Sequence, residues 1–254
     1  MKKLALVTGA TSGIGKATAM LLAENGYSLI LTGRRAELLE SVKKEAEIKH
    51  KTEVLALNFD VRDKEAVASA VESLPERWRK IDVLINNAGL AVGLNHIQDG
   101  VIDDWDRMID TNIKGLLYIT RAIVPLMIER GSGHIINIGS IAGTEVYENG
   151  NVYCASKHAV EAITKGMRID LLKEGIKVSG IRPGMVETEF SSVRYKGDDE
   201  LAKKTYQGIS PLFAEDIAQT ILFVLNRPAH VNINDLVIMP TAQASATYVN
   251  RVVQ

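Results

Sequence analysis

The sequence predicts one α/β domain whose core is a parallel, doubly wound sheet of seven strands with helices on both faces. Short apolar runs alternate with longer segments of helical apolar spacing, which is the pattern of repeated βαβ units. Hydrophobic residues make up 46% of the chain and aromatic residues only 5%, so we expect the aliphatic core of a helix-covered parallel sheet. No internal repeat or proline- and glycine-rich linker divides residues 1–254, which we expect to form a single domain.

The predicted strands of the first half are short apolar runs, and the segments between them place apolar residues three or four positions apart. Gly26 ends the first of these helices, and the second helix is strongly charged. In order, the expected elements are a strand at 4–7, a helix at 14–25, a strand at 27–32, a helix at 35–50, a strand at 54–58, a helix at 64–74 and a strand at 81–85.

Two long helical patterns dominate the second half, and glycines mark the end of each. The first is followed by Gly131-Ser132-Gly133 and the second by Gly175. The expected elements are a helix at 103–130, a strand at 134–138, a helix at 152–174, a strand at 177–181 and a seventh strand at 236–239.

Residues 189–211 are polar, lack clean periodicity and follow the sixth strand. Long irregular segments in a compact domain often act as lids over a binding site. We predict a substrate lid here, and the alternative is an ordinary surface loop.

Composition excludes several classes of protein. The 30 basic and 31 acidic side chains nearly balance, so no charge pattern indicates nucleic acid or an anionic membrane as a partner. The single cysteine, Cys154, excludes an internal disulfide, and no histidines show ligand spacing, so we predict no catalytic metal. The apolar run 4–7 is too short for a signal peptide or a membrane span, so we expect a cytoplasmic location.

The segment Thr8–Gly15 reads G-x-x-x-G-x-G from Gly9 and lies between the first strand and the first helix. Glycines at this position allow a tight turn and let the backbone approach a pyrophosphate, which the helix N-terminus also attracts. The pattern predicts a Rossmann-type dinucleotide site. Its expected cofactor-binding residues are Gly9, Thr11, Ser12, Gly13, Ile14 and Gly15.

Two arginines at the end of the second strand indicate which dinucleotide binds. A chain that binds NAD usually has an acidic residue here to hold the ribose 2′-hydroxyl. This strand ends Thr32-Gly33-Arg34-Arg35, which offers two guanidinium groups to a 2′-phosphate and no carboxylate to repel it. We therefore predict that Arg34 and Arg35 bind NADP(H); the alternative for Arg35 is that it simply begins a charged helix.

Tyr153 and Lys157 are four residues apart on a predicted helix and therefore share one face, with Ser140 thirteen positions before the tyrosine. A neighbouring cation favours the phenolate, so we expect Lys157 to lower the pKa of Tyr153 toward neutrality, as a general acid/base requires. The pair alone is a weak signal, since many surface helices contain it.

The ordered set of Thr8–Gly15, Asn86-Asn87-Ala88-Gly89, Asn112, Ser140 and Tyr153 with Lys157 resembles the short-chain dehydrogenase/reductase family over nearly the whole chain. The resemblance implies adenine contacts from Asp60 and Val61, and a nicotinamide clamp in the loop after the sixth strand. Further cofactor-binding residues implied by it are Asn87, Ala88, Gly89, Tyr153, Lys157, Pro183, Gly184, Val186 and Thr188.

The resemblance also implies a catalytic set of Asn112, Ser140, Tyr153 and Lys157. Ser140 would donate a hydrogen bond to the substrate oxygen while Tyr153 transfers the proton. Lys157 would bind the nicotinamide ribose, and a helix distortion at Asn112 would hold a water near the lysine. The expected class is an alcohol dehydrogenase or carbonyl reductase.

Three segments, residues 150–153, 189–198 and 228–234, are similar to those of the NADP-dependent 3-hydroxy acid dehydrogenases. This similarity implies serine, L-allo-threonine or 3-hydroxypropionate as substrate, with malonic semialdehyde in the reductive direction, and a homotetramer packed through the two long helices. One alternative is a reductase of 3-oxoacyl or other carbonyl substrates. A remote alternative is a catalytically silent nucleotide-sensing module.

A 3-hydroxy acid carries a carboxylate, so the substrate pocket needs a cation. Arg194 and Lys196, both in the expected lid, are the candidates, and Arg182 is a third. Tyr147, between Ser140 and Tyr153, is expected to line the pocket wall.

Overall fold

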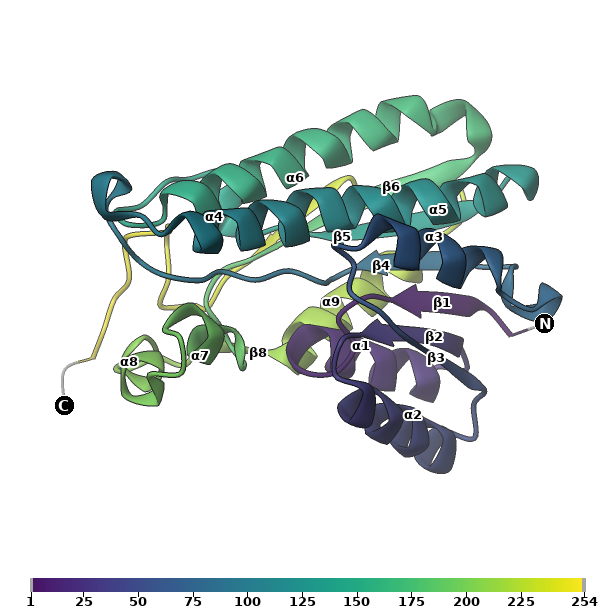
Figure 1. The fold of residues 1–254 in the computed structure, drawn as a ribbon, viewed down its shortest axis with the longest axis horizontal. Coiled ribbons are helices and arrows are strands. Elements are labelled where there is room, and N and C mark those ends of the chain that lie inside the picture. The colour runs from purple at the N-terminus through teal and green to yellow at the C-terminus, as the bar shows by residue number, and fades with distance from the viewer. Residues whose placement is uncertain (1, 253–254) are drawn as a thin grey trace.

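The computed structural model describes residues 2–252 and contains the predicted sheet. Its seven strands are parallel and lie in the order β3-β2-β1-β4-β5-β6-β9 (Figure 1). Their bounds are β1 Leu4–Val7, β2 Ser28–Gly33, β3 Val54–Asn58, β4 Val83–Asn86, β5 Gly133–Ile138, β6 Ile176–Pro183 and β9 Asp235–Ile238. The chain order reverses between β1 and β4, and doubly wound sheets bind ligands at the carboxyl ends of the strands at such a point.

Helices cover both faces of the sheet, as predicted (Figure 1). One face carries α1 Gly13–Glu24, α2 Ala36–His50 and α9 Ala214–Leu225. The other carries α3 Lys64–Glu72, α4 Ile102–Ile109, α5 Leu116–Glu129 and α6 Asn151–Asp170. None of the helices within residues 2–252 is long and apolar enough to cross a bilayer.

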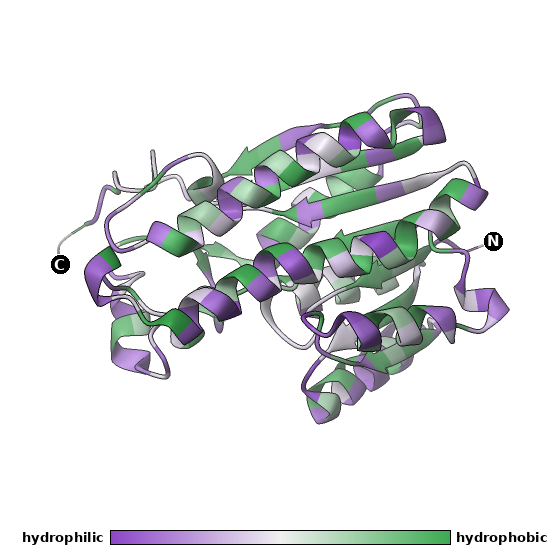
Figure 2. Ribbon diagram, turned by 45° about the horizontal axis from the view of Figure 1, so that its top comes forward, coloured by the Kyte–Doolittle hydropathy of each residue, from purple (hydrophilic) through white to green (hydrophobic). Residues whose placement is uncertain are grey.

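Side chains of each strand alternate between two cores because successive Cβ atoms point to opposite faces of a sheet. Leu4 and Leu6 of β1 pack with α3 and α5, whereas Ala5 and Val7 pack with α1, α2 and α9. Figure 2 shows the strands as a mostly hydrophobic layer between helices that are polar on their outer sides. The buried apolar surface of these two layers is the main stabilising contribution to the fold.

The long helix predicted at 103–130 is interrupted. It consists of α4, a π-helical segment at Asp110–Gly115, and α5. A Cβ on Gly115 would lie 2.8 Å from Val61 Cγ2, so only glycine allows this close approach. The π-helical segment is the helix distortion that the family resemblance implies at Asn112.

The irregular segment at 189–211 contains two short helices, α7 Phe190–Arg194 and α8 Asp199–Lys204. They lie beyond the carboxyl edge of the sheet (Figure 1). A two-stranded parallel sheet, β7 Val186–Glu187 with β8 Leu212–Phe213, closes the base of this segment. Helix α9, which follows it directly and packs against α1, was not predicted from the sequence.

Candidate active site

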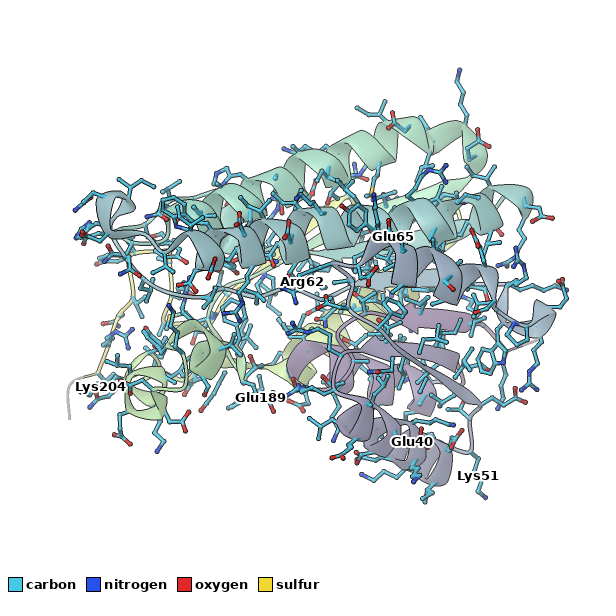
Figure 3. All side chains as sticks on the ribbon, viewed as in Figure 1. Glu40, Lys51, Arg62, Glu65, Glu189 and Lys204 are labelled. Carbon is cyan, nitrogen blue, oxygen red and sulfur yellow. The ribbon has the colours of Figure 1, made fainter. Side chains whose placement is uncertain are left out.

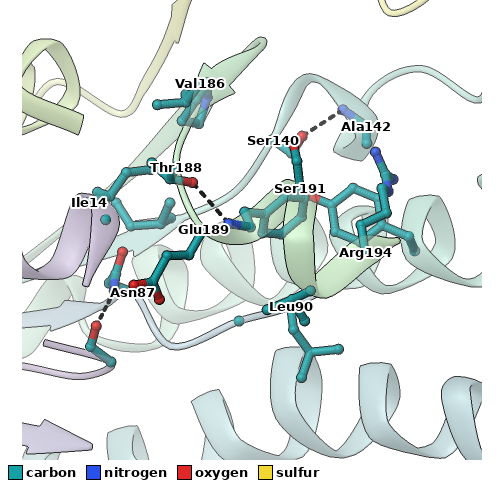
Figure 4. Close-up of a pocket in the computed structure, with 18 of the residues that line it drawn as sticks. Ile14, Asn87, Leu90, Ser140, Ala142, Val186, Thr188, Glu189, Ser191 and Arg194 are labelled. Atoms are coloured by element: carbon teal, nitrogen blue, oxygen red, sulfur yellow. Dashed lines mark hydrogen bonds between the residues drawn. The ribbon is translucent and has the colours of Figure 1, made fainter. Parts of the chain in front are cut away.

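A cavity of about 770 Å³ opens at the carboxyl edge of the sheet, a size ordinary for sites that bind small molecules (Figure 4). It brings together the glycine loop, the two arginines after β2, the predicted lid and three of the predicted catalytic residues, Ser140, Tyr153 and Lys157 (the predicted trio). In Figure 4, Ile14 and Asn87 lie at one end of the cavity, and Ser140 and Arg194 lie at the other. The predicted residues that line it are Gly9, Thr11, Ser12, Gly13, Ile14, Arg34, Arg35, Asp60, Val61, Asn87, Ala88, Gly89, Ser140, Tyr147, Tyr153, Lys157, Pro183, Gly184, Val186, Thr188 and Arg194.

Two predicted site residues, Gly15 and Asn112, do not line the cavity. Gly15 lies behind the glycine loop, where a Cβ would come within 2.3 Å of the Gly9 carbonyl oxygen and 2.5 Å of Asn87 Nδ2. Its role is therefore to let α1 approach the loop closely. Gly9 and Gly13 have left-handed backbones, with φ of +64° and +51°, which the tight turn requires.

The N-terminus of α1 faces this loop. Ser12 is its N-cap, but the Ser12 side chain does not cap the helix and instead accepts a hydrogen bond from Arg35. The first N–H groups of the helix therefore lack a side-chain cap, and the positive end of the helix dipole favours a phosphate there. This arrangement fits a dinucleotide bound across the glycine loop.

We expect Gly15→Ala to weaken NADPH binding by at least about tenfold and to lower Tm, because the new methyl group forces the Gly9 carbonyl out of the turn. Fluorescence titration with NADPH and thermal unfolding measure the two effects. Gly166→Ala, near the C-terminal end of α6 where a Cβ meets no atom within 4 Å, is the control. The control should bind NADPH normally and be stabilised by about 0.5–1 kcal/mol. Equal NADPH affinity in the two variants would contradict the close-approach role of Gly15.

The run after β4 ties the glycine loop to the sheet. The Asn87 side chain donates to the carbonyls of Thr8 and Gly9, and Thr8 Oγ1 accepts from the backbone N–H groups of Asn87 and Ala88. Asn86 is buried and donates to Thr120 and to Asn137 on β5. These bonds fix the floor of the cavity between β1, β4 and β5.

The two arginines at the end of β2 face the cofactor end of the cavity. Arg35 donates to Thr11 Oγ1 at 2.8 Å and to Ser12 Oγ at 2.7 Å. Arg34 Nη1 lies 3.6 Å from Asp60 Oδ2, and Arg62 donates to the same carboxylate. This group of guanidinium and hydroxyl groups is suited to an anionic ligand.

The predicted trio meets where β5 ends and α6 begins. Tyr153 and Lys157 lie on one buried face of α6, and Lys157 Nζ donates to the Ile138 carbonyl at 2.9 Å. Ser140 follows β5, and its hydroxyl accepts from the Ala142 N–H at 3.1 Å (Figure 4). Its own proton can then be donated to the Tyr153 hydroxyl or to a substrate oxygen.

Asn112 acts on the wall of the cavity rather than in it. Its amide exchanges two 2.8 Å hydrogen bonds with the backbone of Leu90 and donates to Ser156 Oγ at 2.9 Å. Asn112 therefore joins the π-helical segment, the loop after β4 and α6. A water held beside Lys157 by this residue stays a prediction.

The predicted effect of Lys157 on Tyr153 is wrong in this structure. Burial raises the pKa of Tyr153, opposed by the positive charge of Arg194 and a hydrogen bond with Ser140. Burial also lowers the pKa of Lys157 itself to about 8, opposed by Glu161. The physical reason is desolvation, which penalises the charged form of both groups and which the four-residue spacing does not reveal.

Arg194 lies in an aromatic cluster at the substrate end of the cavity. Its guanidinium carbon is 5.0 Å from the centre of the Tyr153 ring, 5.5 Å from that of Tyr147 and 5.7 Å from that of Phe190. One terminal nitrogen donates to the Tyr147 hydroxyl, while the buried Nε has no hydrogen-bond partner among residues 2–252. The guanidinium therefore retains an unused donor beside Tyr153.

The other two candidate cations are wrong. Lys196 pairs with the buried Asp104 of α4 at 2.6 Å and does not line the cavity. Arg182 lies on β6 and is held by Glu161 at 2.6 Å and Asp235 at 2.7 Å. Sequence position placed both near the site, but each charge already has an acidic partner.

Several lining residues were missed from the sequence. Phe190 packs against Tyr153 with ring centroids 5.7 Å apart, Glu189 contacts Arg35, and a C-terminal segment closes one side of the cavity. Glu189 and Phe190 begin the 189–198 segment that resembles the 3-hydroxy acid dehydrogenases, but that similarity assigned them no role, and the fold brings them to the site. Within residues 2–252 no three His, Cys, Asp or Glu side chains are grouped to hold a metal ion, and the absence of a metal stays a prediction.

Comparison with known proteins decides the family. The model of the short chain dehydrogenase family matches residues 3–199, which include the glycine loop, Ser140, Tyr153 and Lys157. This chain belongs to the short-chain dehydrogenase family. The predicted family, fold class and oxidoreductase class are confirmed.

Relatives of this short-chain dehydrogenase are similar over their full length. The NADP-dependent 3-hydroxy acid dehydrogenase YdfG of Salmonella typhi is 49% identical over 244 residues, which are 96% of this chain and 97% of the relative. Sulfoacetaldehyde reductase 2 of Chromohalobacter salexigens is 46% identical over 249 residues, 98% of each chain. A solved structure, the closed form of serine dehydrogenase complexed with NADP+, is 45% identical with a TM-score of 0.91 and covers 99% of this chain and 100% of its own.

Proposed function

We propose that this short-chain dehydrogenase transfers a hydride between NADP(H) and the 3-hydroxyl or 3-oxo carbon of a small 3-hydroxy acid. Serine, L-allo-threonine and the pair of 3-hydroxypropionate and malonic semialdehyde are the expected substrates. The observation that carries this proposal is the guanidinium of Arg194, 5.0 Å from the ring of Tyr153 inside the cavity. A carboxylate bound there brings the third carbon of the acid close to the catalytic hydroxyl. The names of the relatives support the same substrate class.

NADP(H), when bound, supplies or accepts the hydride at its nicotinamide ring. Ser140 holds the substrate oxygen by donating a hydrogen bond, and the Tyr153 hydroxyl gives or takes the proton on that oxygen. Lys157 holds a proton beside the site, where its lowered pKa of about 8 makes proton exchange easy near neutral pH. Arg34 and Arg35 fit the 2′-phosphate that distinguishes NADP(H) from NAD(H).

We expect Arg194→Met to raise the KM for serine by about a hundredfold, because a charge-assisted hydrogen bond to the substrate carboxylate is lost. The kcat/KM for 1,3-propanediol, which has the reacting alcohol but no carboxylate, should change by less than about threefold. Steady-state assays at the nicotinamide absorbance measure both. Lys203→Met, which removes an exposed lid cation on α8, is the matched control. An unchanged KM for serine would exclude Arg194 as the carboxylate-binding residue.

A second candidate is reduction of another carbonyl substrate. The similarity to sulfoacetaldehyde reductase 2 favours it, because a sulfonate is also an anion that a guanidinium binds. Serine, 3-hydroxypropionate, sulfoacetaldehyde and a 3-oxoacyl thioester assayed side by side distinguish the substrates. A protein that binds NADPH and converts none of them, nor a broad panel of alcohols, would be a silent nucleotide-sensing module.

A homotetramer stays our expectation. Exposed apolar residues on the long helices support it, including Leu117 and Ile128 on α5 and Ile169, 75% exposed, on α6. Such residues on one side of a molecule are typical of an interface. Light scattering of the purified protein measures the mass that decides it.

A further inference from the structure

The lid is joined to the cofactor end of the cavity by one ion pair. Arg35 Nη1 lies 2.9 Å from Glu189 Oε2, and Glu189 is the residue that precedes α7. Figure 3 labels Glu189 at the border between the lid helices and the start of α1. Burial tends to raise the pKa of Glu189, but hydrogen bonds from Arg35 and Ser12 hold that pKa below its usual range. The carboxylate of Glu189 is therefore charged at neutral pH.

Arg35 is also a guanidinium group that fits the 2′-phosphate of NADP(H). Its Nε and Nη2 donate to neutral hydroxyls of Thr11 and Ser12, and only Nη1 is engaged by an anion. A phosphate that uses the fork of this guanidinium takes the donor that Glu189 holds. Two anions bound to one guanidinium repel each other, so phosphate and carboxylate compete.

Glu189 is the residue directly before the short helix α7 Phe190–Arg194, and Arg194 is the last residue of that helix. Phe190 and Arg194 both contact the ring of Tyr153. A shift of Glu189 therefore changes the position of the helix that carries the proposed carboxylate-binding residue. The Glu189–Arg35 pair thus connects the two ends of the cavity.

We propose that Glu189 is a specificity-determining residue that competes with the 2′-phosphate of NADP(H) for Arg35, so that the identity of the cofactor affects α7. This inference rests on the proposed cofactor but not on the proposed substrate. NADPH releases Glu189 from Arg35, whereas NADH, which lacks the phosphate, leaves the pair intact. Glu189 thereby lowers the preference of the native protein for NADPH.

The test is a fluorescence titration of the full-length protein with NADPH and with NADH. We expect Glu189→Gln to raise the ratio of Kd(NADH) to Kd(NADPH) by about threefold to tenfold, a modest change because Glu189 and Arg35 side chains are 57% and 46% exposed. The matched control is Glu187→Gln, two residues earlier on β7, which should leave the ratio unchanged. Arg35→Met should lower the ratio, and Glu189→Gln added to Arg35→Met should not raise it again.

An unchanged ratio in Glu189→Gln would overturn the proposal. An equal increase of the ratio when Glu189→Gln is added to Arg35→Met would also overturn it, because Glu189 would then affect NADPH binding without Arg35. Circular dichroism shows whether each variant is folded, and Glu189→Ala provides a second variant for the same cycle. These titrations need no substrate, so their failure is distinct from failure of the serine assays.

Hydrogen exchange tests the link to the lid. The amides of 190–194 in the native protein should exchange at rates that differ by at least about threefold between the NADPH and NADH complexes. In Glu189→Gln the two complexes should exchange alike. Equal rates in the native protein would overturn the link to α7.

Discussion

Tyr153→Phe is expected to lower kcat with serine by about a thousandfold, because general acid/base catalysis by one side chain typically contributes 10²- to 10⁴-fold. The aromatic ring, which packs against Phe190 and Arg194, is retained. NADPH should therefore bind with an affinity within about threefold of that of the native protein. Steady-state kinetics and fluorescence titration measure the two quantities separately.

Tyr27→Phe is the matched control for Tyr153→Phe. Tyr27 is buried in the core between β2 and α1, and its hydroxyl has no hydrogen-bond partner within residues 2–252. Removing that hydroxyl should leave kcat unchanged and should not lower Tm, because no hydrogen bond is lost. A Tyr153→Phe enzyme that retains a tenth or more of native kcat would exclude the phenol as the proton donor.

Lys157→Met is expected to lower kcat/KM by about a hundredfold or more, because the site loses its buried proton carrier.

Lys157→Met also changes how the stability of the protein depends on pH. The pKa of Lys157 is about 8 in the folded protein and 10.5 for an ordinary lysine, so between these values the unfolded chain binds more protons than the folded one. This lysine therefore costs the native protein the most stability below about pH 8, and the cost declines as pH rises toward 10.5.

The Tm of Lys157→Met minus that of the native protein should accordingly fall as pH rises from 8 to 10. Because the two proteins share all their other titratable groups, the difference in Tm removes the effect of those groups. Lys173→Met, an exposed lysine in the turn after α6, should show a constant difference over the same range. A constant difference for Lys157→Met would mean that the buried ammonium is already stabilised by its surroundings.

The strands and the glycine loop could be predicted because each follows from local chemistry. An apolar run such as 4–7 needs burial on both faces, and three glycines in Thr8–Gly15 permit a backbone that other residues cannot adopt. All seven strands of the main sheet begin and end within two residues of their predicted bounds. The last, for example, was predicted at 236–239 and is Asp235–Ile238. Helix α9 had a usable signal, since Ile217, Ile221 and Val224 are spaced by four and three residues.

The remaining features depend on contacts between distant segments. Lys196 is two residues after Arg194 in the lid, but it pairs with Asp104, ninety-two positions earlier, and a sequence does not display that pairing. The raised pKa of Tyr153 follows from its burial in the folded chain, where Phe190 packs against its ring. The competition between Glu189 and a phosphate joins residues 154 positions apart.

The π-helical segment at Asp110–Gly115 has a consequence for how this chain tolerates insertions and deletions. A π turn holds an additional residue, so it rotates everything after it by about 100° relative to a continuous α-helix. The apolar side of α5 faces the sheet only because of that rotation. Deletion of one residue there would convert the π turn to α-helix and rotate the apolar side of α5 toward water. Deletion of one residue in an exposed surface loop would change the stability of the protein little. The packing of α5 against the sheet therefore constrains the length of this turn.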